Sequence, residues 1–309
     1  MVEDRRALAA PPTAPGTGSM TVDLREAATT SPDISSPSAA RPTAAPVAVT
    51  RARLDGTGAE SGLRPVAVEA AVNVVYGTVP YAVMMMTPAD LEDFGVGFSL
   101  TEGVIQARAD VRGTRVEDDP DGLRLVVNLV PERFHALLAR RRSMSGRTSC
   151  GVCGLEDLAA VPRTPQRAHA GTAVNVAAIR RALDELPGRQ ALNQETGAVH
   201  AAAWVGLDGG ITCLREDVGR HNALDKLVGA LLTEGVDPAA GFLLVTSRCS
   251  YEMVEKAAAL GAGTMVAISA PTSMGVERAR HHGLTLVGLA RKDTMTVFAG
   301  SVLPEAAGG

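Results

Sequence analysis

Two cysteines separated by two residues are the sharpest chemical feature of this sequence. Cys150 and Cys153 lie in the glycine-rich run 146–154, and four arginines, at positions 140, 141, 142 and 147, lie within ten residues before Cys150. Nearby cations favour the thiolate and can lower a cysteine pKa from about 8.5 to roughly 3.5–7.5. A thiolate can attack a donor persulfide, hold the terminal sulfur and release it to an acceptor. The motif favours sulfur transfer, with both cysteines as candidate catalytic residues.

Other uses of the two cysteines stay open on spacing alone. A tetrahedral zinc site would need two more cysteines or histidines at finger-like spacing, whereas Cys213 and Cys249 lie 60 and 96 residues beyond Cys153. A thioredoxin-type dithiol would follow an apolar strand, and here arginine and glycine precede the motif. Sulfur or redox chemistry, a metal site and an inert pair therefore remain the three interpretations of this motif.

A second polar cluster lies between an expected strand and an expected helix, at 216–226. Arg220 and His221 lie within it, in the position where open α/β sheets bind ligands. Arg248 and Ser273 lie in two further strand-to-helix turns, and helix N-termini bind anions. Together the three turns suggest a ligand that carries phosphate. The plainer interpretation is a helix start capped by Asn222, with the charged side chains of residues 225 and 226 in solvent.

The expected elements predict an α/β fold, α+β overall. Strands are expected at 66–75, 79–86, 123–130, 199–206, 211–215, 242–246, 264–270, 284–289 and 295–299. Helices are expected at 131–142, 174–186, 222–232, 251–260 and 273–282, and another after Thr87, which would cap it with Pro88 at the first helical position. The alternation after residue 173 predicts a mostly parallel sheet with helices on its faces.

Composition divides the chain and limits its class. Residues 1–46 are rich in Ala, Pro, Ser and Thr and are expected to be disordered; 47–145 form an α+β domain, 146–172 the CxxC loop and linker, and 173–309 the second domain. The net charge of −4 argues against general nucleic-acid binding. No apolar run of about 18 residues and no secretory signal is present, so a cytoplasmic protein is expected.

Three smaller features receive structural interpretations. His200 follows an apolar pattern and is expected to be a core histidine with its polar atoms satisfied. The three methionines at 84–86 are expected to fill core. His281 and His282 end a helix, where cations complement the dipole, so no metal site is assigned to them or to any other residue.

The sequence resembles the formate dehydrogenase accessory sulfurtransferases, the FdhD family, from about residue 64 to residue 300. The resemblance rests on ordered blocks at 85–103, 146–154, 196–203, 217–226, 247–256 and 269–279. Family members are understood to accept sulfur as a persulfide from a cysteine desulfurase. They pass it to the bis(molybdopterin guanine dinucleotide) molybdenum cofactor before that cofactor enters formate dehydrogenase.

The resemblance also implies residue roles and a fold. It implies that Cys150 carries the persulfide with Cys153 assisting, that the chain is a homodimer, and that its second domain resembles the cytidine deaminase fold. It implies cofactor contacts in one late segment, namely Leu289, Ala290, Arg291, Lys292, Asp293 and Thr294. A zinc deaminase needs a His-x-Glu motif and a later Pro-Cys-x-x-Cys motif. Deaminase activity is excluded because alanine, not glutamate, lies two residues after His200, and because Ser149, not proline, precedes Cys150. The alternatives are a cofactor chaperone that handles no sulfur and an interaction module with a structural zinc.

Overall fold

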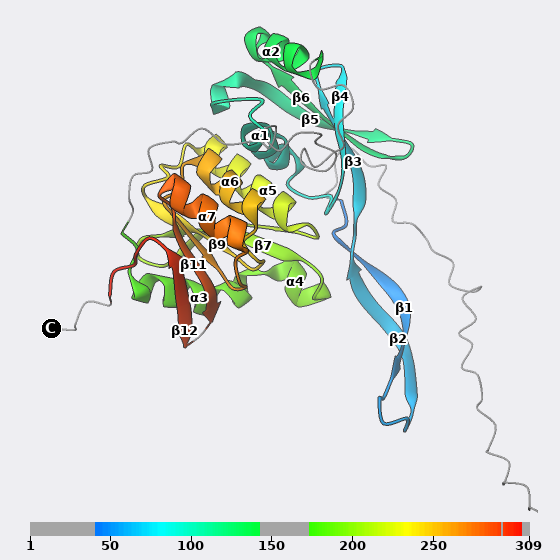
Figure 1. The fold of residues 1–309 in the computed structure, drawn as a ribbon. Coiled ribbons are helices and arrows are strands. Elements are labelled where there is room, and N and C mark those ends of the chain that lie inside the picture. Colours follow the sequence, from blue (N-terminus) through cyan, green and yellow to red (C-terminus); the bar gives the residue numbers. More distant parts are fainter. Residues whose placement is uncertain (1–40, 143–172, 292, 305–309) are drawn as a thin grey trace, which may run out of the picture. The chain divides into compact units, whose positions relative to one another are not determined.

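The computed structural model describes residues 41–142, 173–291 and 293–304. Its strands form three sheets, of two, four and six strands (Figure 1). The CxxC motif lies in 143–172, outside the described residues, as does most of the expected disordered tail. Among the helices that are described, none is long and apolar enough to cross a membrane.

A two-stranded antiparallel hairpin opens the described chain. It consists of β1 (Ala44–Ala52) and β2 (Ala59–Ala67), in register from Ala44 opposite Ala67 to Ala52 opposite Ala59. Sequence patterning missed β1, and the expected start of order at residue 47 falls inside this strand. Most side chains of the hairpin are exposed, so the apolar alternation that usually reveals a strand is weak here.

The four-stranded sheet has the strand order β4-β3-β6-β5. Its elements are β3 (Ala70–Tyr76), β4 (Val79–Met86), α1 (Leu91–Thr101), the 3-10 turn η1 (Arg108–Asp110), β5 (Val111–Asp119), β6 (Gly122–Leu129) and α2 (Pro131–Arg142). β3 and β4 pair in antiparallel orientation as a hairpin, with Gly77 at φ 61° in its turn. The single strand expected at 66–75 is wrong, because the chain leaves the first sheet after Ala67 and enters the second at Ala70.

The six-stranded sheet is mixed, with the order β12-β11-β10-β9-β7-β8. It consists of β7 (His200–Gly206), β8 (Ile211–Asp217), β9 (Gly241–Val245), β10 (Thr264–Ala267), β11 (Thr285–Arg291) and β12 (Thr294–Ala299). Only β9, β10 and β11 pair in parallel. The expectation of a mostly parallel sheet is wrong, because β7–β8 and β11–β12 are joined by short turns, and short turns can join only antiparallel strands.

Helices cover both faces of this sheet and make three layers (Figure 1). They are α3 (Val176–Arg189), α4 (Ala191–Thr196), α5 (Arg220–Glu234), α6 (Tyr251–Leu260) and α7 (Ser273–His282). Successive side chains of β9 point to opposite faces of the sheet. Phe242 and Leu244 pack with residues of α3 on one face. Leu243 and Val245 pack with residues of α5, α6 and α7 on the other. The bounds expected for the last two helices are confirmed.

The larger core joins the two halves of the chain, because α1 crosses α5 at close range. A Cβ placed on Gly97 would lie 1.8 Å from the carbonyl oxygen of Asp225, and one on Gly229 would lie 1.8 Å from that of Asp93. Both glycines are therefore required by the approach of the two helices. Of the three methionines expected in the core, Met86 is fully buried but Met85 is 50% exposed, so that expectation is wrong for Met85, whose side chain points away from the core.

Candidate functional site

One edge of the six-stranded sheet collects most of the predicted site residues. β9, β10 and β11 end there, and so does β8, since β8 and β9 both run antiparallel to β7. The first residue of β7, His200, lies opposite Asp217 at the end of β8. The turns that carry Arg220, Arg248 and Ser273 therefore follow strands that end at one edge, as the sequence predicts.

Short contacts join the last three turns of this edge. The Thr272 N–H donates to the Cys249 carbonyl at 2.9 Å, and the Leu289 N–H donates to the Ser269 carbonyl at 3.1 Å. A Cβ on Gly288 would lie 2.8 Å from Pro271 Cδ, so the end of β11 lies directly against the turn before α7. These contacts make the edge a continuous surface across three strands.

Arg220 brings an unsatisfied donor to the edge. Its Nε is buried and has no hydrogen-bond partner among the residues that the structure describes. Burial lowers the pKa of His200, the Arg220 guanidinium lowers it further, and Asp217 opposes both. His200 is half-buried beside these charges, so the expected core histidine is instead part of the charged edge. Arg220 and a neutral His200 can both donate hydrogen bonds to an anion.

Two polar pairs connect the first turns of α5 and α6. At the sheet edge, His221 Nε2 lies 3.2 Å from Glu252 Oε2. One helical turn further along both helices, Lys256 Nζ lies 2.8 Å from Asp225 Oδ2. The close approach of His221 lowers the pKa of Glu252. Sequence reasoning missed Glu252. The signal was present, because residues 221 and 225 on one helix and 252 and 256 on the other each recur at the spacing of one helical face.

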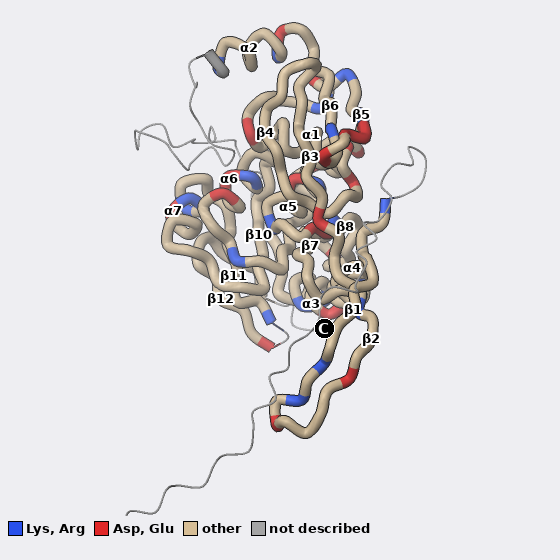
Figure 2. Tube along the Cα trace, turned by 90° about the vertical axis from the view of Figure 1, so that its right-hand side faces the viewer, with Lys and Arg blue, Asp and Glu red and all other residues tan. Residues whose placement is uncertain are grey.

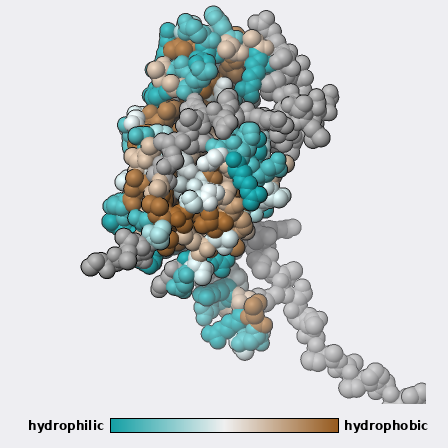
Figure 3. Space-filling view, turned by 60° about the vertical axis from the view of Figure 1, so that its left-hand side comes forward, coloured by the Kyte–Doolittle hydropathy of each residue, from teal (hydrophilic) through white to brown (hydrophobic). Residues whose placement is uncertain are grey.

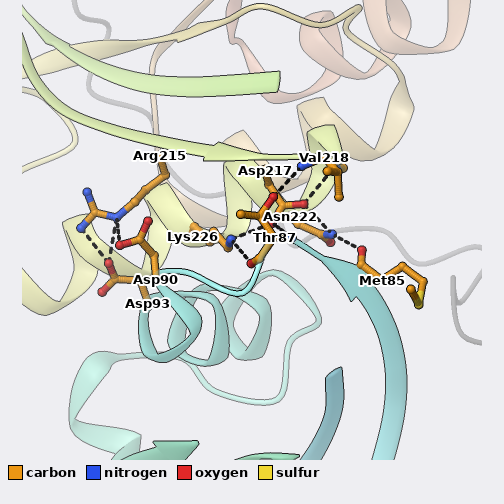
Figure 4. Close-up of polar contacts among 10 residues, drawn as sticks. Met85, Thr87, Asp90, Asp93, Arg215, Asp217, Val218, Asn222 and Lys226 are labelled. Atoms are coloured by element: carbon orange, nitrogen blue, oxygen red, sulfur yellow. Dashed lines mark hydrogen bonds and ion pairs between the residues drawn. The ribbon is translucent and has the colours of Figure 1, made fainter. Parts of the chain in front are cut away.

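Beneath the surface of the sheet edge, Asp217 is fully buried, and surrounding residues provide hydrogen-bond and charge partners for its carboxylate (Figure 4). Its carboxylate accepts hydrogen bonds from the Gly219 and Thr87 N–H groups at 2.7 and 3.1 Å and lies 2.6 Å from Lys226 Nζ. Lys226 also donates to the Thr87 carbonyl at 2.9 Å, so the segment between β4 and α1 is held against the start of α5.

This network corrects three expectations from the sequence. Asn222 is not the cap of α5: it lies inside the helix and donates to the Met85 carbonyl at 2.9 Å, while Gly219 is the N-cap. Asp225 and Lys226 are buried, not solvated. Thr87 does not cap α1, which begins at Leu91 after Asp90, because the Thr87 hydroxyl accepts from the Val218 N–H at 3.2 Å.

The expected cofactor segment lies at the end of β11 and the start of β12. Leu289 has φ 52°, an unusual backbone conformation for a side chain of its size, and is 38% exposed. Ala290 is fully buried in the core on the α3 side, so it is not on the surface that a ligand could contact. Arg291, Asp293 and Thr294 are exposed, and Lys292 lies outside the described residues.

Apolar surface accompanies these charges. Figure 3 shows apolar side chains gathered on the face that carries β11 and β12, and the exposed large apolar residues in this part of the chain are Met274, Leu289, Val297 and Leu303. Arg248 and Ser273 are exposed as well, and the N-cap of α7 is Thr272, whose hydroxyl accepts from the Gly275 N–H at 3.2 Å. Apolar surface beside a few placed polar groups is typical of a site for a small molecule.

The two cysteines that the structure describes are poor nucleophiles. Burial raises the pKa of Cys249 to about 12, and burial also raises the pKa of Cys213. Cys249 has no exposed surface, and its sulfur lies 3.6 Å from Met265 Sδ. Both thiols are therefore protonated at neutral pH and inert.

His282, the last residue of α7, does not act as a helix-dipole cation in the way expected from the sequence. His282 is buried against Glu255 of α6, with Nε2 3.1 Å from Oε1, and burial lowers its pKa. His282 therefore contributes hydrogen bonding between two helices, not a positive charge.

Comparison with known proteins identifies the family of this chain. The sequence profile of the FdhD/NarQ family matches residues 67–302. The chain belongs to the FdhD/NarQ family. The match covers the four-stranded sheet, the six-stranded sheet and the 143–172 segment that contains the CxxC motif, and it begins where the β1–β2 hairpin ends.

Two relatives agree with this assignment, and one solved structure shares the fold. The Sulfur carrier protein FdhD of Xanthomonas euvesicatoria is 49% identical over 76% of this chain and 83% of its own length. That of Cupriavidus necator is 47% identical over 76% of this chain and 81% of its own length. The crystal structure of a protein assigned as a formate dehydrogenase accessory protein, from Desulfotalea psychrophila, has the same fold. It covers 85% of this chain and all of its own, with a TM-score of 0.68 and 24% identity.

Proposed function

We propose that this chain is a sulfurtransferase that carries sulfur for the activation of formate dehydrogenase. In this proposal a cysteine desulfurase transfers sulfur to Cys150 as a persulfide, with Cys153 assisting. The sulfur then passes to the molybdenum cofactor, Mo-bis(molybdopterin guanine dinucleotide), before that cofactor is inserted into formate dehydrogenase. The relatives named as sulfur carriers support the role, and the reaction is placed in the cytoplasm.

The burial and protonation of Cys213 and Cys249 are the observation that carries the proposal. The chain has four cysteines, and the two that the structure describes are buried and protonated. Sulfur transfer requires a thiolate, which attacks the donor persulfide and displaces the donor thiolate while the terminal sulfur moves across. Cys150 and Cys153 are the other two, and four arginines in the preceding sequence favour their thiolate form.

The edge of the six-stranded sheet is the proposed binding surface for the acceptor. The guanine dinucleotide arms carry phosphates, and phosphate oxygens accept hydrogen bonds from arginine and from the free N–H groups at helix N-termini. Arg220 and Arg248 lie at two such turns, and the buried Nε of Arg220 has no partner among the described residues. His221, held by Glu252, and Ser273 add further donors, and the backbone around Leu289 borders the same surface.

A pair of cysteine variants tests the function. Cys150→Ala is expected to abolish activation of formate dehydrogenase in cells that lack the native protein, with the purified variant folded as the wild type by circular dichroism. Cys249→Ala is the matched control: it also removes one thiol, and activation is expected to continue because that thiol is inert. Full activation by Cys150→Ala would overturn the proposal.

A cofactor chaperone that handles no sulfur is the second candidate, and the charged sheet edge favours it as well. It predicts that a Cys150→Ala, Cys153→Ala double variant still activates formate dehydrogenase, whereas Arg220→Gln does not. The sulfurtransferase predicts that both variants fail. Activity of the double variant therefore separates the two functions.

A further inference from the structure

The charged sheet edge contains an acidic side chain beside the groups that we propose bind phosphate. Glu252 lies in the first turn of α6, and its Oε2 is 3.2 Å from Nε2 of His221, in the first turn of α5. A carboxylate repels an anionic ligand unless a positive charge close to it compensates. The effect of Glu252 on a bound phosphate therefore depends on the charge of its neighbours.

Glu252 is held in its ionised form. The close approach of His221 lowers the pKa of Glu252, against the effect of burial, and the charges of Arg220 and Lys256 lower it further. The Ser250 hydroxyl donates to Glu252 Oε2 at 3.4 Å, and the start of a helix favours an acidic side chain. Of the two groups in this pair, the imidazole and not the carboxylate takes up a proton near neutral pH.

The charges one helical turn further along are engaged with each other. Lys256 Nζ lies 2.8 Å from Asp225 Oδ2, and Figure 2 shows acidic and basic residues close together on α6. Burial raises the pKa of Glu102, at the C-cap of α1, where Lys256 and Asp225 also act on it. Because Lys256 and Asp225 compensate each other, the compensation of Glu252 depends on the sheet edge itself.

The other charged groups of the edge keep a constant charge near neutral pH. Arg220 is protonated throughout. Burial and the Arg220 guanidinium lower the pKa of His200, which is neutral there. Asp217 is fully buried 2.6 Å from Lys226. Among the described residues of this edge that leaves His221, and histidine is the side chain whose charge changes at physiological pH.

The ring of His221 offers one nitrogen to a ligand. Nε2 is buried against Glu252 while the side chain as a whole is 31% exposed, so Nδ1 is the nitrogen that a ligand can reach. A neutral imidazole carries one N–H and one lone pair, whereas the imidazolium carries two N–H groups. A lone pair on Nε2 would face a carboxylate oxygen, so the neutral ring keeps its proton on Nε2. Only the imidazolium can donate a hydrogen bond from Nδ1.

We propose that His221 binds a phosphate of the acceptor only as the imidazolium, and that Glu252 is the positioning residue that keeps the ring charged and oriented. Binding then takes up one proton, and release returns it to solvent. Loss of the proton removes the Nδ1–H donor and leaves the Glu252 carboxylate uncompensated beside the phosphate, so both changes favour release. This role rests on the binding surface of the proposed function, but not on the chemistry of Cys150.

The pH dependence of binding tests this role on the full-length protein. The probe is two guanosines joined by a 5′,5′-pyrophosphate, whose charge is constant, whereas a terminal phosphate itself titrates near about pH 6. With alanine at 150 and 153, so that no reactive thiol titrates, the Kd is expected to rise between about pH 6 and about pH 8, by at most about tenfold per pH unit. His221→Gln keeps a neutral donor, and its Kd is expected not to change with pH. A pH-dependent Kd in His221→Gln equal to that of the parent protein would overturn the proposal.

Glu252→Gln separates the positioning role from a merely structural one. Loss of the carboxylate disfavours the imidazolium, so the pH at which binding weakens is expected to move lower, with binding retained at the acidic end of the range. Glu277→Gln is the matched control, because it removes the same charge from an exposed position on α7, and it is expected to keep the parent profile. Identical profiles for the two variants would contradict the role of Glu252.

Calorimetry counts the proton directly. The enthalpy of probe binding, measured in buffers of different ionisation enthalpy, gives the number of protons taken up per probe bound. Above neutral pH the parent protein is expected to take up a fraction of one proton, and His221→Gln none. No proton uptake by the parent protein would overturn the proposal.

Two outcomes distinguish this role from the proposed function as a whole. Binding with the same Kd at every pH would overturn the role of His221 and leave the binding surface in place. No binding at any pH would overturn both the role and the binding surface. Persulfide formation on Cys150 is measured separately and is independent of either result.

Discussion

Lys226 Nζ lies 2.6 Å from Asp217 Oδ2, and both side chains are fully buried. The pair connects the end of β8 to the second turn of α5, and Lys226 also donates to the Thr87 carbonyl between β4 and α1. A buried ion pair persists only where hydrogen bonds satisfy its remaining groups, as the Gly219 and Asn222 donors do for Asp217. This pair therefore fixes the base of the charged sheet edge and joins it to the other half of the chain.

Removal of one partner of this pair is expected to cost about 3–5 kcal/mol of unfolding free energy, because it leaves the other charge buried and unpaired. The variant is Lys226→Met, measured by urea denaturation. The matched control is Arg181→Gln, which breaks an ion pair with Asp208 between side chains that are 59% and 68% exposed. The control is expected to lose less than about 1 kcal/mol. Equal losses in the two variants would contradict the structural role of Lys226.

The crossing of α1 and α5 predicts a strong preference for glycine at position 97. Gly97→Ala would place a methyl group 1.8 Å from the Asp225 carbonyl oxygen, so the helices must separate, at a cost of about 1–3 kcal/mol or more. Gly188→Ala in α3 is the control, because a Cβ there meets no atom within 4 Å. Alanine favours a helix over glycine, so the control is expected to gain up to about 1 kcal/mol. Thermal melting of both variants checks the opposite signs.

His200 reports the charge on Arg220. Because burial and the Arg220 guanidinium lower the pKa of His200, the variant Arg220→Gln is expected to raise it. Proton NMR titration measures the change, with His200→Gln to assign the resonance and Arg181→Gln as a distant control. A pKa of His200 unchanged by Arg220→Gln would contradict the arrangement.

The same shift has a consequence for stability. The unfolded chain binds a proton at His200 more readily than the folded chain, so this residue makes stability rise with pH. The contribution is fully lost once the pH falls below the lowered folded pKa, and it is recovered as the pH rises past about 6.5, the ordinary histidine value. Arg220→Gln is expected to reduce this pH dependence.

Leu289 combines an unusual backbone with a position at the candidate site. Leu289→Gly relieves a φ of 52° and is expected to raise the free energy of unfolding by about 1 kcal/mol. Leu207→Gly is the control: Leu207 is similarly exposed at 44%, but its φ is not positive, so glycine there is expected to destabilise by about 0.5–1 kcal/mol. Destabilisation in both variants would show that the backbone at Leu289 carries no strain.

Local patterns in the sequence predicted much of the fold. The bounds of α6 and α7 were predicted from apolar spacing and from turn residues at both ends, and the bounds of β4 from its strand-like run. The antiparallel direction of β8 and β12 was not predicted. It follows from the short turns that join each of them to the preceding strand, and the general alternation of helices and strands does not show these turns. β5 was missed, since most of its side chains are partly or fully exposed and its apolar pattern is correspondingly weak.

The site was predicted only in part, because local patterns show the turns that carry its residues but not the tertiary contacts that bury some of them. The positions of Arg220, Arg248 and Ser273 at one edge follow from strand-to-helix turns, which are local. The burial of Asp225 and Lys226 was not predicted, because it is produced by Thr101, Thr87 and Lys256, residues 30 or more positions away. Charged residues in a helix are usually solvated, and only tertiary contacts reverse that expectation.

Persulfide formation on Cys150 is the central claim, and mass spectrometry tests it most directly. The purified protein is incubated with an active cysteine desulfurase and cysteine, and its intact mass and peptides are then measured. The expected result is added sulfur on the peptide that contains Cys150, removed by reductant and absent from the Cys150→Ala variant, with the Cys213 and Cys249 peptides unmodified. An unmodified Cys150 peptide, with the desulfurase shown to be active, would contradict the account.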